Sequence, residues 1–245
     1  RFNFVQFWDG RAKDLAEQAK IPVLDPVEMG MKSWAEVVSR LSKDAAYTAA
    51  FKAVYGGEIT ENRVVDAIAE FEKTLVTVNS PFDQFLRGKQ DALTVQQARG
   101  YELFKSYGCI ACHQGQNVGG NMFQKFGVLK DITLETGTLS KDLGRYNVTK
   151  NEWDKRFFKV PSLRLAAKTP PYFHDGSVPT LEKAVDIMIR FQLGRSVPDK
   201  DRKAIISFLE RLIYASGVSG FFGALSLLGR LSEKRSKNFL IPSST

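Results

Sequence analysis

The segment "YGCIACHQG", residues 107–115, contains both cysteines of the chain and one of its two histidines. Cys109 and Cys112 are separated by two residues and His113 follows directly, which is the spacing of c-type haem attachment. In such a motif the two thiols form thioethers with the haem vinyl groups, and the adjacent histidine becomes an axial ligand of the iron. We therefore predict a covalently bound haem c at Cys109, Cys112 and His113.

Three other interpretations of the cysteine pair are weaker. A zinc site needs four nitrogen or sulfur ligands, and beyond the motif the sequence offers one further histidine or cysteine, His174. A thioredoxin-like redox pair belongs at the start of a helix within a βαβ pattern, which the sequence does not show. A disulfide across a two-residue gap closes too short a loop to stabilise the fold much. Covalent haem also favours an exported, periplasm-like compartment.

The sequence on either side of the motif predicts helices joined by long loops. Thr94 and Gln97 form a capping-box pattern, which predicts a helix that leads into the motif. Two more helices are expected over residues 181–191 and 199–214, from their apolar spacing. The Gly-rich polar region that follows the motif, up to about residue 160, is expected to form loops with little regular structure. We predict an all-α fold.

Pro81 and Gly88 interrupt the helical pattern, and this predicts a domain boundary in their neighbourhood. We expect one domain over residues 1–82, a cytochrome c-like haem domain over 83–214, and a C-terminal tail of unclear structure over 215–245. The longest apolar stretch of that tail is well short of the roughly 20 residues that a transmembrane helix needs. We therefore expect no transmembrane span.

The net charge of the chain is positive, 35 − 27 = +8, with an isoelectric point near 9.4. Its hydrophobic content of 43% is ordinary for a globular protein, so the chain can bury a core. The basic residues are not gathered in runs, except near the C-terminus, and we expect no nucleic-acid partner. A positive surface favours partners that carry an acidic patch.

A haem iron bound by His113 has a sixth coordination position, and few residues are suited to fill it. Those available are His174, Met29, Met31, Met122 and Met188. Met188 lies on an apolar helical face, where a methionine usually fills the core. A haem that carries electrons is best served by two protein ligands, and thioether ligation raises its potential. From the local sequence Met188 is the leading candidate, and Met122 is its main rival.

Four motifs follow one another along the chain: "FNFVQFWDGRAKDLAEQAKIPVLDPVEMGM", "GCIACHQG", "FKVPSLRLAAKTPPYFHDGSVPTLEKAVDIMIRFQLG" and "DRKAIISFLERL". In this order and spacing, over residues 2–214, the chain resembles the bacterial dihaem cytochrome c peroxidases and the related MauG-like proteins. Members of that family are periplasmic, usually homodimeric, and reduce hydrogen peroxide to water. They have a peroxidatic haem, an electron-transferring haem and a calcium ion between the domains. Their electron donors are small c-type cytochromes or blue-copper proteins.

The resemblance implies roles for residues around the cysteine motif. The two cysteines and His113 match the attachment motif of the electron-transfer haem, and Met188 matches its second axial ligand. MauG-like proteins have a tyrosine in that place, so a protein-oxidising enzyme of the MauG type is the least favoured alternative. Thr169 and Pro171 match positions whose backbone carbonyls bind calcium, a cation that prefers oxygen ligands.

The resemblance also implies a catalytic role for the opening segment, which matches the region over the distal side of the peroxidatic haem. Gln6 matches a glutamine there, and Glu17 matches an acidic residue that handles peroxide. The Glu17 carboxylate would move a proton between the two peroxide oxygens. Relatives often have two glutamates at this point, and this chain has Ala16 in place of the first. The sequence leaves open which of the two carboxylates does the chemistry in the family, and if it is the first, this chain lacks it.

The sequence contains one haem-attachment motif, whereas the family has a first motif upstream of the region matched here. Residues 1–82 are therefore expected to be the remainder of a peroxidatic haem domain, in a fragment of a longer protein or in a one-haem descendant. Two functions stay open at this point: a cytochrome c peroxidase, and a single-haem electron-transfer module without peroxidase activity.

Overall fold

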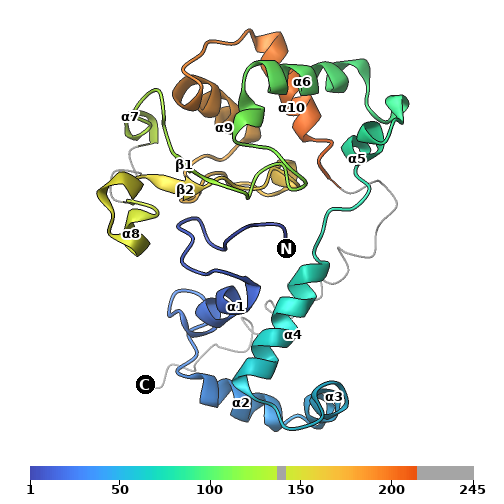
Figure 1. The fold of residues 1–245 in the computed structure, drawn as a ribbon, viewed down its shortest axis with the longest axis vertical. Helices are drawn as coiled ribbons and strands as arrows, with labels where there is room; N and C mark the ends of the chain where they lie inside the picture. Colours follow the sequence, from blue (N-terminus) through green and yellow to red (C-terminus); the bar gives the residue numbers. More distant parts are fainter. Residues whose placement is uncertain (137–141, 214–245) are drawn as a thin grey trace, which may run out of the picture.

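The computed structural model describes residues 1–136 and 142–213, and the predicted tail over 215–245 lies outside the described residues. The described chain is mostly helical (Figure 1). The helices are α1 (Leu15–Leu24), α2 (Trp34–Ser42), α3 (Ala45–Tyr55), α4 (Glu61–Thr74), α5 (Pro81–Leu86), α6 (Val95–Ser106), α7 (Thr133–Thr136), α8 (Tyr146–Thr149), α9 (Leu181–Ile187) and α10 (Asp199–Leu209). Among these described helices, none combines the length and the apolar character required to cross a bilayer.

A two-stranded antiparallel sheet makes the all-α prediction correct only in part. Strand β1 (Phe123–Lys125) pairs with strand β2 (Phe157–Lys159), with Gln124 opposite Phe158. Both strands lie in the region that the sequence predicted as loops. Each strand has three residues, and this is too short for an alternating pattern to be recognised in the sequence.

The sequence predicted the starts of helices better than their ends. At the start of α6 the Thr94 hydroxyl accepts a hydrogen bond from Gln97 N at 3.3 Å, and the Gln97 side chain accepts one from Thr94 N at 3.0 Å. Both halves of the predicted capping box are therefore present. The helix predicted over 181–191 is α-helical only as far as Ile187 and continues as a π-helix, Met188–Gln192.

The core of the C-terminal half forms where α6 crosses α10 (Figure 1). A Cβ atom on Gly100 of α6 would lie 2.0 Å from the carbonyl oxygen of Ala204 on α10, so the two helices approach as closely as backbone atoms allow. The apolar side chains packed around this crossing are Phe82, Leu93, Phe104, Val118, Val185, Ile189, Ile205, Ile206, Phe208, Leu209 and Leu212. This contact fixes the end of α6, from which the cysteine motif continues.

Helices α1 to α4 lie together, apart from the elements that follow α5, and the N-terminal segment runs between the two groups (Figure 1). That segment is bonded to the C-terminal half at several points. Phe4 N donates to the Gly120 carbonyl at 2.9 Å, and the Trp8 carbonyl accepts from Lys159 N at 2.7 Å. The N-terminal segment therefore contributes to the surroundings of the sheet and of the cavity described below.

Candidate haem site

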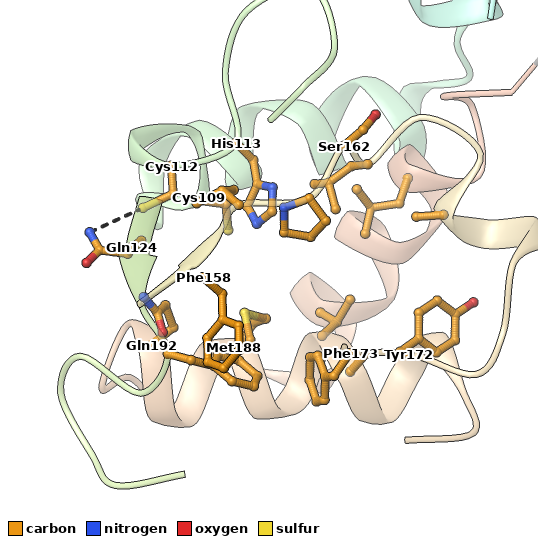
Figure 2. A pocket seen from close by; sticks show the side chains of 18 of the residues that line it. Cys109, Cys112, His113, Gln124, Phe158, Ser162, Tyr172, Phe173, Met188 and Gln192 are labelled. Atoms are coloured by element: carbon orange, nitrogen blue, oxygen red, sulfur yellow. Dashed lines mark hydrogen bonds between the residues drawn. The ribbon is translucent and has the colours of Figure 1, made fainter. Parts of the chain in front are cut away.

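A mostly apolar cavity of about 280 Å³ lies beside the cysteine motif. Its walls are formed by the end of α6, the chain that follows β2, the helix that carries Met188, and α10 (Figure 2). The apolar side chains that line it include Phe104, Phe158, Leu163, Val185, Ile205 and Leu209. Such walls exclude water and suit a large apolar ligand with few polar contacts.

A tight turn brings the three residues of the haem-attachment motif onto one wall. Gly108 has a φ of 101°, a left-handed conformation that glycine adopts without strain, and it ends α6. A 3₁₀ turn, Cys109–Ala111, follows, and His113 N donates to the Cys109 carbonyl at 3.0 Å. Both thiols and the imidazole consequently face the same cavity (Figure 2).

The imidazole of His113 is half-buried and lines the cavity. Its Nδ1 atom is buried and makes no hydrogen bond within the described part of the chain. Burial lowers the pKa of His113 to about 4, and polar contact with the backbone at Val118 and Pro161 opposes this only in part. A neutral imidazole is the form that binds a metal, so this ring has the protonation state of a ligand.

The two cysteines are half-buried, and the Cys109 thiol does not have the properties of a redox-active thiol. Cys109 and Cys112 are not joined in a disulfide. Burial raises the pKa of the Cys109 thiol to about 11, whereas redox-active Cys-x-x-Cys pairs have lowered pKa values. Among the described residues no three histidine, cysteine or acidic side chains are arranged to hold a metal ion by themselves. The geometry therefore favours neither the thioredoxin-like nor the zinc interpretation.

Met188 lies on the wall opposite His113 (Figure 2). It is the residue at which α9 ends and the π-helix begins. Met122, its rival in the sequence, does not line this cavity; its backbone carbonyl accepts a hydrogen bond from Val160 N at 2.9 Å, beside the sheet. Of the two methionines, the fold brings Met188 to the cavity.

The predicted calcium positions, Thr169 and Pro171, also line the cavity. The carbonyl oxygen of neither residue accepts a hydrogen bond from another described residue. His174 lies in the same wall, stacked on Phe158 with the ring centroids 4.3 Å apart, and its Nε2 is 3.0 Å from Asp142 Oδ2. The structure therefore brings these residues together with the cysteine motif.

Gln6 and Glu17, the predicted peroxide-handling residues, do not meet in one cavity. Gln6 is buried in a backbone bridge to Ala12, and it lines a second, open hollow beside α1 and α4. Glu17 does not line that hollow, and its carboxylate accepts from Lys13 N at 2.9 Å and is ion-paired with Lys13 Nζ at 2.8 Å. The neighbouring Gln18 has a buried side-chain oxygen without a partner in the described chain, a feature that the sequence did not indicate.

Sequence reasoning also missed three residues of the main cavity. Trp8, from the N-terminal segment, lines it and contacts the His174 ring edge-on at a centroid distance of 6.0 Å. Gln124 places its amide 4.0 Å from Cys112 Sγ, and Gln192 lies beside Met188 (Figure 2). No local pattern distinguishes these residues, because they reach the site only through pairing and packing between distant segments.

Together these observations meet the requirements of a c-type haem. The cavity has apolar walls, a pair of unbonded thiols, and a neutral imidazole on the same wall as the thiols. A thioether stands on the opposite wall. His and Met are a ligand pair used by electron-transferring cytochromes. The residues present therefore fit a haem bound through Cys109 and Cys112, with His113 and Met188 on its two faces.

Comparison with known proteins places the chain in a family. Residues 1–91 match the sequence model of the di-haem cytochrome c peroxidases. The chain is 49% identical over 211 residues to the cytochrome c peroxidase Ccp of Escherichia coli, covering 86% of this chain and 45% of that protein. It is 46% identical over 212 residues to the cytochrome c551 peroxidase of Nitrosomonas europaea, covering 86% and 62%. The chain thus spans about half the length of the curated relatives that it matches.

More distant relatives and solved structures agree with this placement. The chain is 34% identical over 223 residues to the methylamine utilization protein MauG of Methylorubrum extorquens, covering 84% of this chain and 60% of that protein. A crystal structure of a MauG-like protein associated with microbial copper homeostasis aligns with a TM-score of 0.73 at 25% identity, covering 88% of this chain and 74% of the other. The diheme peroxidase BthA from Burkholderia thailandensis shares the fold, with a TM-score of 0.69 at 21% identity, covering 86% and 66%.

The fold and the cavity define a haem protein of the c type. More particularly, the chain belongs to the di-haem cytochrome c peroxidase family, which includes the MauG proteins.

Proposed function

We propose that this chain supplies the electron-transfer haem of a cytochrome c peroxidase, which reduces hydrogen peroxide to water. The observation that carries the proposal is the convergence of the Cys109–His113 motif and Met188 on opposite walls of one apolar cavity. His113 and Met188 would both hold the iron of a bound haem, which would leave no place at this site for peroxide. Such a site suits electron passage, and peroxide would react elsewhere in the complete enzyme.

Each residue of the site has a distinct task in this proposal. Cys109 and Cys112 would hold the haem covalently, and their thiols lie on one wall of the cavity. His113 would bind the iron through Nε2, since Nδ1 is enclosed on the side of Gly119 and Pro161. Met188 would bind the opposite face. A bound haem c supplies a one-electron couple, whose potential the thioether raises.

The surroundings support two finer parts of the proposal. The carbonyls of Thr169 and Pro171, free of hydrogen bonds from described residues, would bind calcium beside the haem. Gln6 and Glu17 remain our proposal for the peroxide side. Hydrogen bonds from the side chain and the backbone N–H of Lys13 lower the pKa of Glu17. To handle peroxide, the Glu17 carboxylate would have to leave Lys13.

The proposed setting of the enzyme follows from the family. We propose a periplasmic homodimer that takes electrons from a small c-type cytochrome or a blue-copper protein. The net charge of +8 favours a donor with an acidic patch. In that case the rate of electron transfer from the donor should fall as salt is added, because salt screens the attraction.

The experiment that tests the function combines a haem count with a ligand variant. The mass of the intact mature protein gives its length and the number of covalent haems. The holoprotein is then mixed with a reduced small c-type cytochrome and hydrogen peroxide. The oxidation of that cytochrome measures the turnover of peroxide. Met188→Ala should abolish the thioether–iron absorbance band and lower the midpoint potential. A band that survives in Met188→Ala would exclude Met188 as the ligand.

A single-haem electron-transfer module is the second candidate. It is favoured by one observation, the presence of one Cys-x-x-Cys-His motif in this sequence. One covalent haem in the mature protein, a low-spin His/Met spectrum and no turnover of peroxide would establish this module instead. Two covalent haems with turnover would establish the peroxidase.

A further inference from the structure

The helix that carries Met188 changes its winding at that residue. It is α-helical over Leu181–Ile187 and π-helical over Met188–Gln192, and Leu193 N donates to the Met188 carbonyl at 3.1 Å to close the π turn. A π turn is less favourable than an α turn and occurs mostly as a single turn, frequently at functional sites. The direction in which Met188 leaves the helix therefore depends on whatever stabilises this turn.

Gln192, the last residue of the π-helix, is tied to the last residue of β1 and to the chain that follows it by both ends of its side-chain amide. Its Nε2 donates to the Lys125 carbonyl at 3.0 Å, and its Oε1 accepts from Gly127 N at 2.9 Å. A primary amide is able to donate and accept at the same time, so one side chain satisfies two backbone groups. Without it those two groups lose their partner, which is costly for the buried N–H of Gly127 and less so for the carbonyl of the exposed Lys125.

Backbone contacts hold the same two segments together. The Phe191 carbonyl accepts from both Leu129 N and Lys130 N at 3.1 Å. A Cβ atom on Gly194 would lie 2.7 Å from the side chain of Leu129, so the loop is packed tightly against the end of the helix. The π-helix and residues 125–130 therefore form one docked unit, and Gln192 provides its side-chain bonds.

This loop begins at β1, which belongs to the wall that carries the cysteines. Gln124 and Lys125 are consecutive residues of β1, and the Gln124 amide lies 4.0 Å from Cys112 Sγ. Gln124 and Gln192 lie at the same end of the cavity, the first toward Cys112 and the second toward Met188 (Figure 2). Gln192 thus connects the Met188 wall to the cysteine wall.

We propose that Gln192 is a positioning residue, which holds Met188 at the separation and orientation that thioether ligation requires. The proposal rests on the proposed function, in which Met188 is the ligand of a haem attached to Cys109 and Cys112. Gln192 acts through the π turn and its bonds to the loop, without binding the haem itself. Loosening this connection frees the turn to relax, and the thioether then competes less well for the iron.

The test measures how easily an added ligand displaces Met188. The holoprotein is titrated with imidazole while the thioether–iron absorbance band is followed. Gln192→Leu removes both side-chain hydrogen bonds, and the imidazole concentration for half-displacement should fall about tenfold, which corresponds to about 0.7 kcal/mol per lost bond. Gln192→Glu keeps the acceptor for Gly127 N but loses the donor to the Lys125 carbonyl, and should give a smaller fall of about threefold.

Two controls separate the possible failures. Gln90→Leu changes an exposed glutamine of a 3₁₀ turn that does not line the cavity, and should leave the imidazole titration unchanged. Met188→Ala should lack the band altogether. If the band persists in Met188→Ala, the assignment of Met188 is wrong and the proposal falls with it.

The proposal itself is overturned in a different way. If Met188→Ala loses the band, but Gln192→Leu lowers only the thermal unfolding temperature and binds imidazole like the wild type, the amide is structural and positions nothing. Should Gln192→Leu not fold, Gln192→Glu decides, because it preserves the length of the side chain. Unchanged imidazole binding in Gln192→Glu then overturns the proposal, and a fall supports it.

Discussion

Replacing Arg164 with leucine should destabilise the protein more than replacing a surface basic residue. The guanidinium of Arg164 binds both carboxylate oxygens of Asp83, at 2.7 and 3.2 Å. The two side chains are only 11% and 15% exposed, so water replaces little of the interaction when one partner is lost. Asp83 also accepts two hydrogen bonds from Ser80, at 2.9 Å each, and these keep it in place beside the missing charge.

The expected cost is about 3 kcal/mol, the lower end of the range for breaking a buried ion pair from one side. For a chain of this size that corresponds to a fall in melting temperature of roughly 6–12 °C. The pair joins α5, which contains Asp83, to the chain after β2, which contains Arg164. The three residues before Arg164 line the cavity. The loss should therefore also loosen one wall of the haem site.

The assay is thermal unfolding of the holoprotein, followed by circular dichroism, with Lys203→Leu as the matched control. Lys203 is paired with Asp199 at 2.8 Å, but the two side chains are 70% and 56% exposed, and such pairs contribute less than about 1 kcal/mol. Adding Asp83→Asn to Arg164→Leu removes the unpaired charge, and the double variant should be more stable than the sum of the single losses predicts. If Arg164→Leu melts no lower than Lys203→Leu, the reasoning from burial is wrong.

Two further predictions concern helix packing and acid stability. Gly100→Ala should lower the free energy of unfolding by about 1–3 kcal/mol, measured by urea denaturation, because the added methyl meets the Ala204 carbonyl and forces α6 away from α10. An unchanged midpoint would show that the helices separate without cost. Hydrogen bonds from Arg190 and Lys183 lower the pKa of Glu135 to about 2, below its usual value of about 4.3. The stability that Glu135 contributes should therefore be present above about pH 4.3 and lost as the pH falls towards 2. The difference in melting temperature between wild type and Glu135→Gln should shrink over that interval, and a constant difference would contradict the assigned pKa.

The sequence by itself determined those features that depend on near neighbours in the chain. The spacing of Cys109, Cys112 and His113 predicts haem attachment because one short turn suffices to place all three on the same wall. The capping box of Thr94 and Gln97 marked the start of α6 for the same reason, since its hydrogen bonds span three residues. The resemblance of the four motifs to a known family was likewise present in the sequence.

Only the tertiary structure decided which distant groups share the cavity. The local sequence favours Met188 as the second ligand but leaves Met122 as a rival. The packing of the Met188 helix brings Met188 to the cavity, while Met122 stays beside the sheet. Strands β1 and β2 form because they pair with each other. Each is too short to show an alternating pattern in the sequence. The π turn and the Gln192 bonds depend on a loop more than 60 residues earlier, at Lys125 and Gly127. Such contacts follow from the complete fold, because their energy is gained only when segments remote in sequence are already packed against each other.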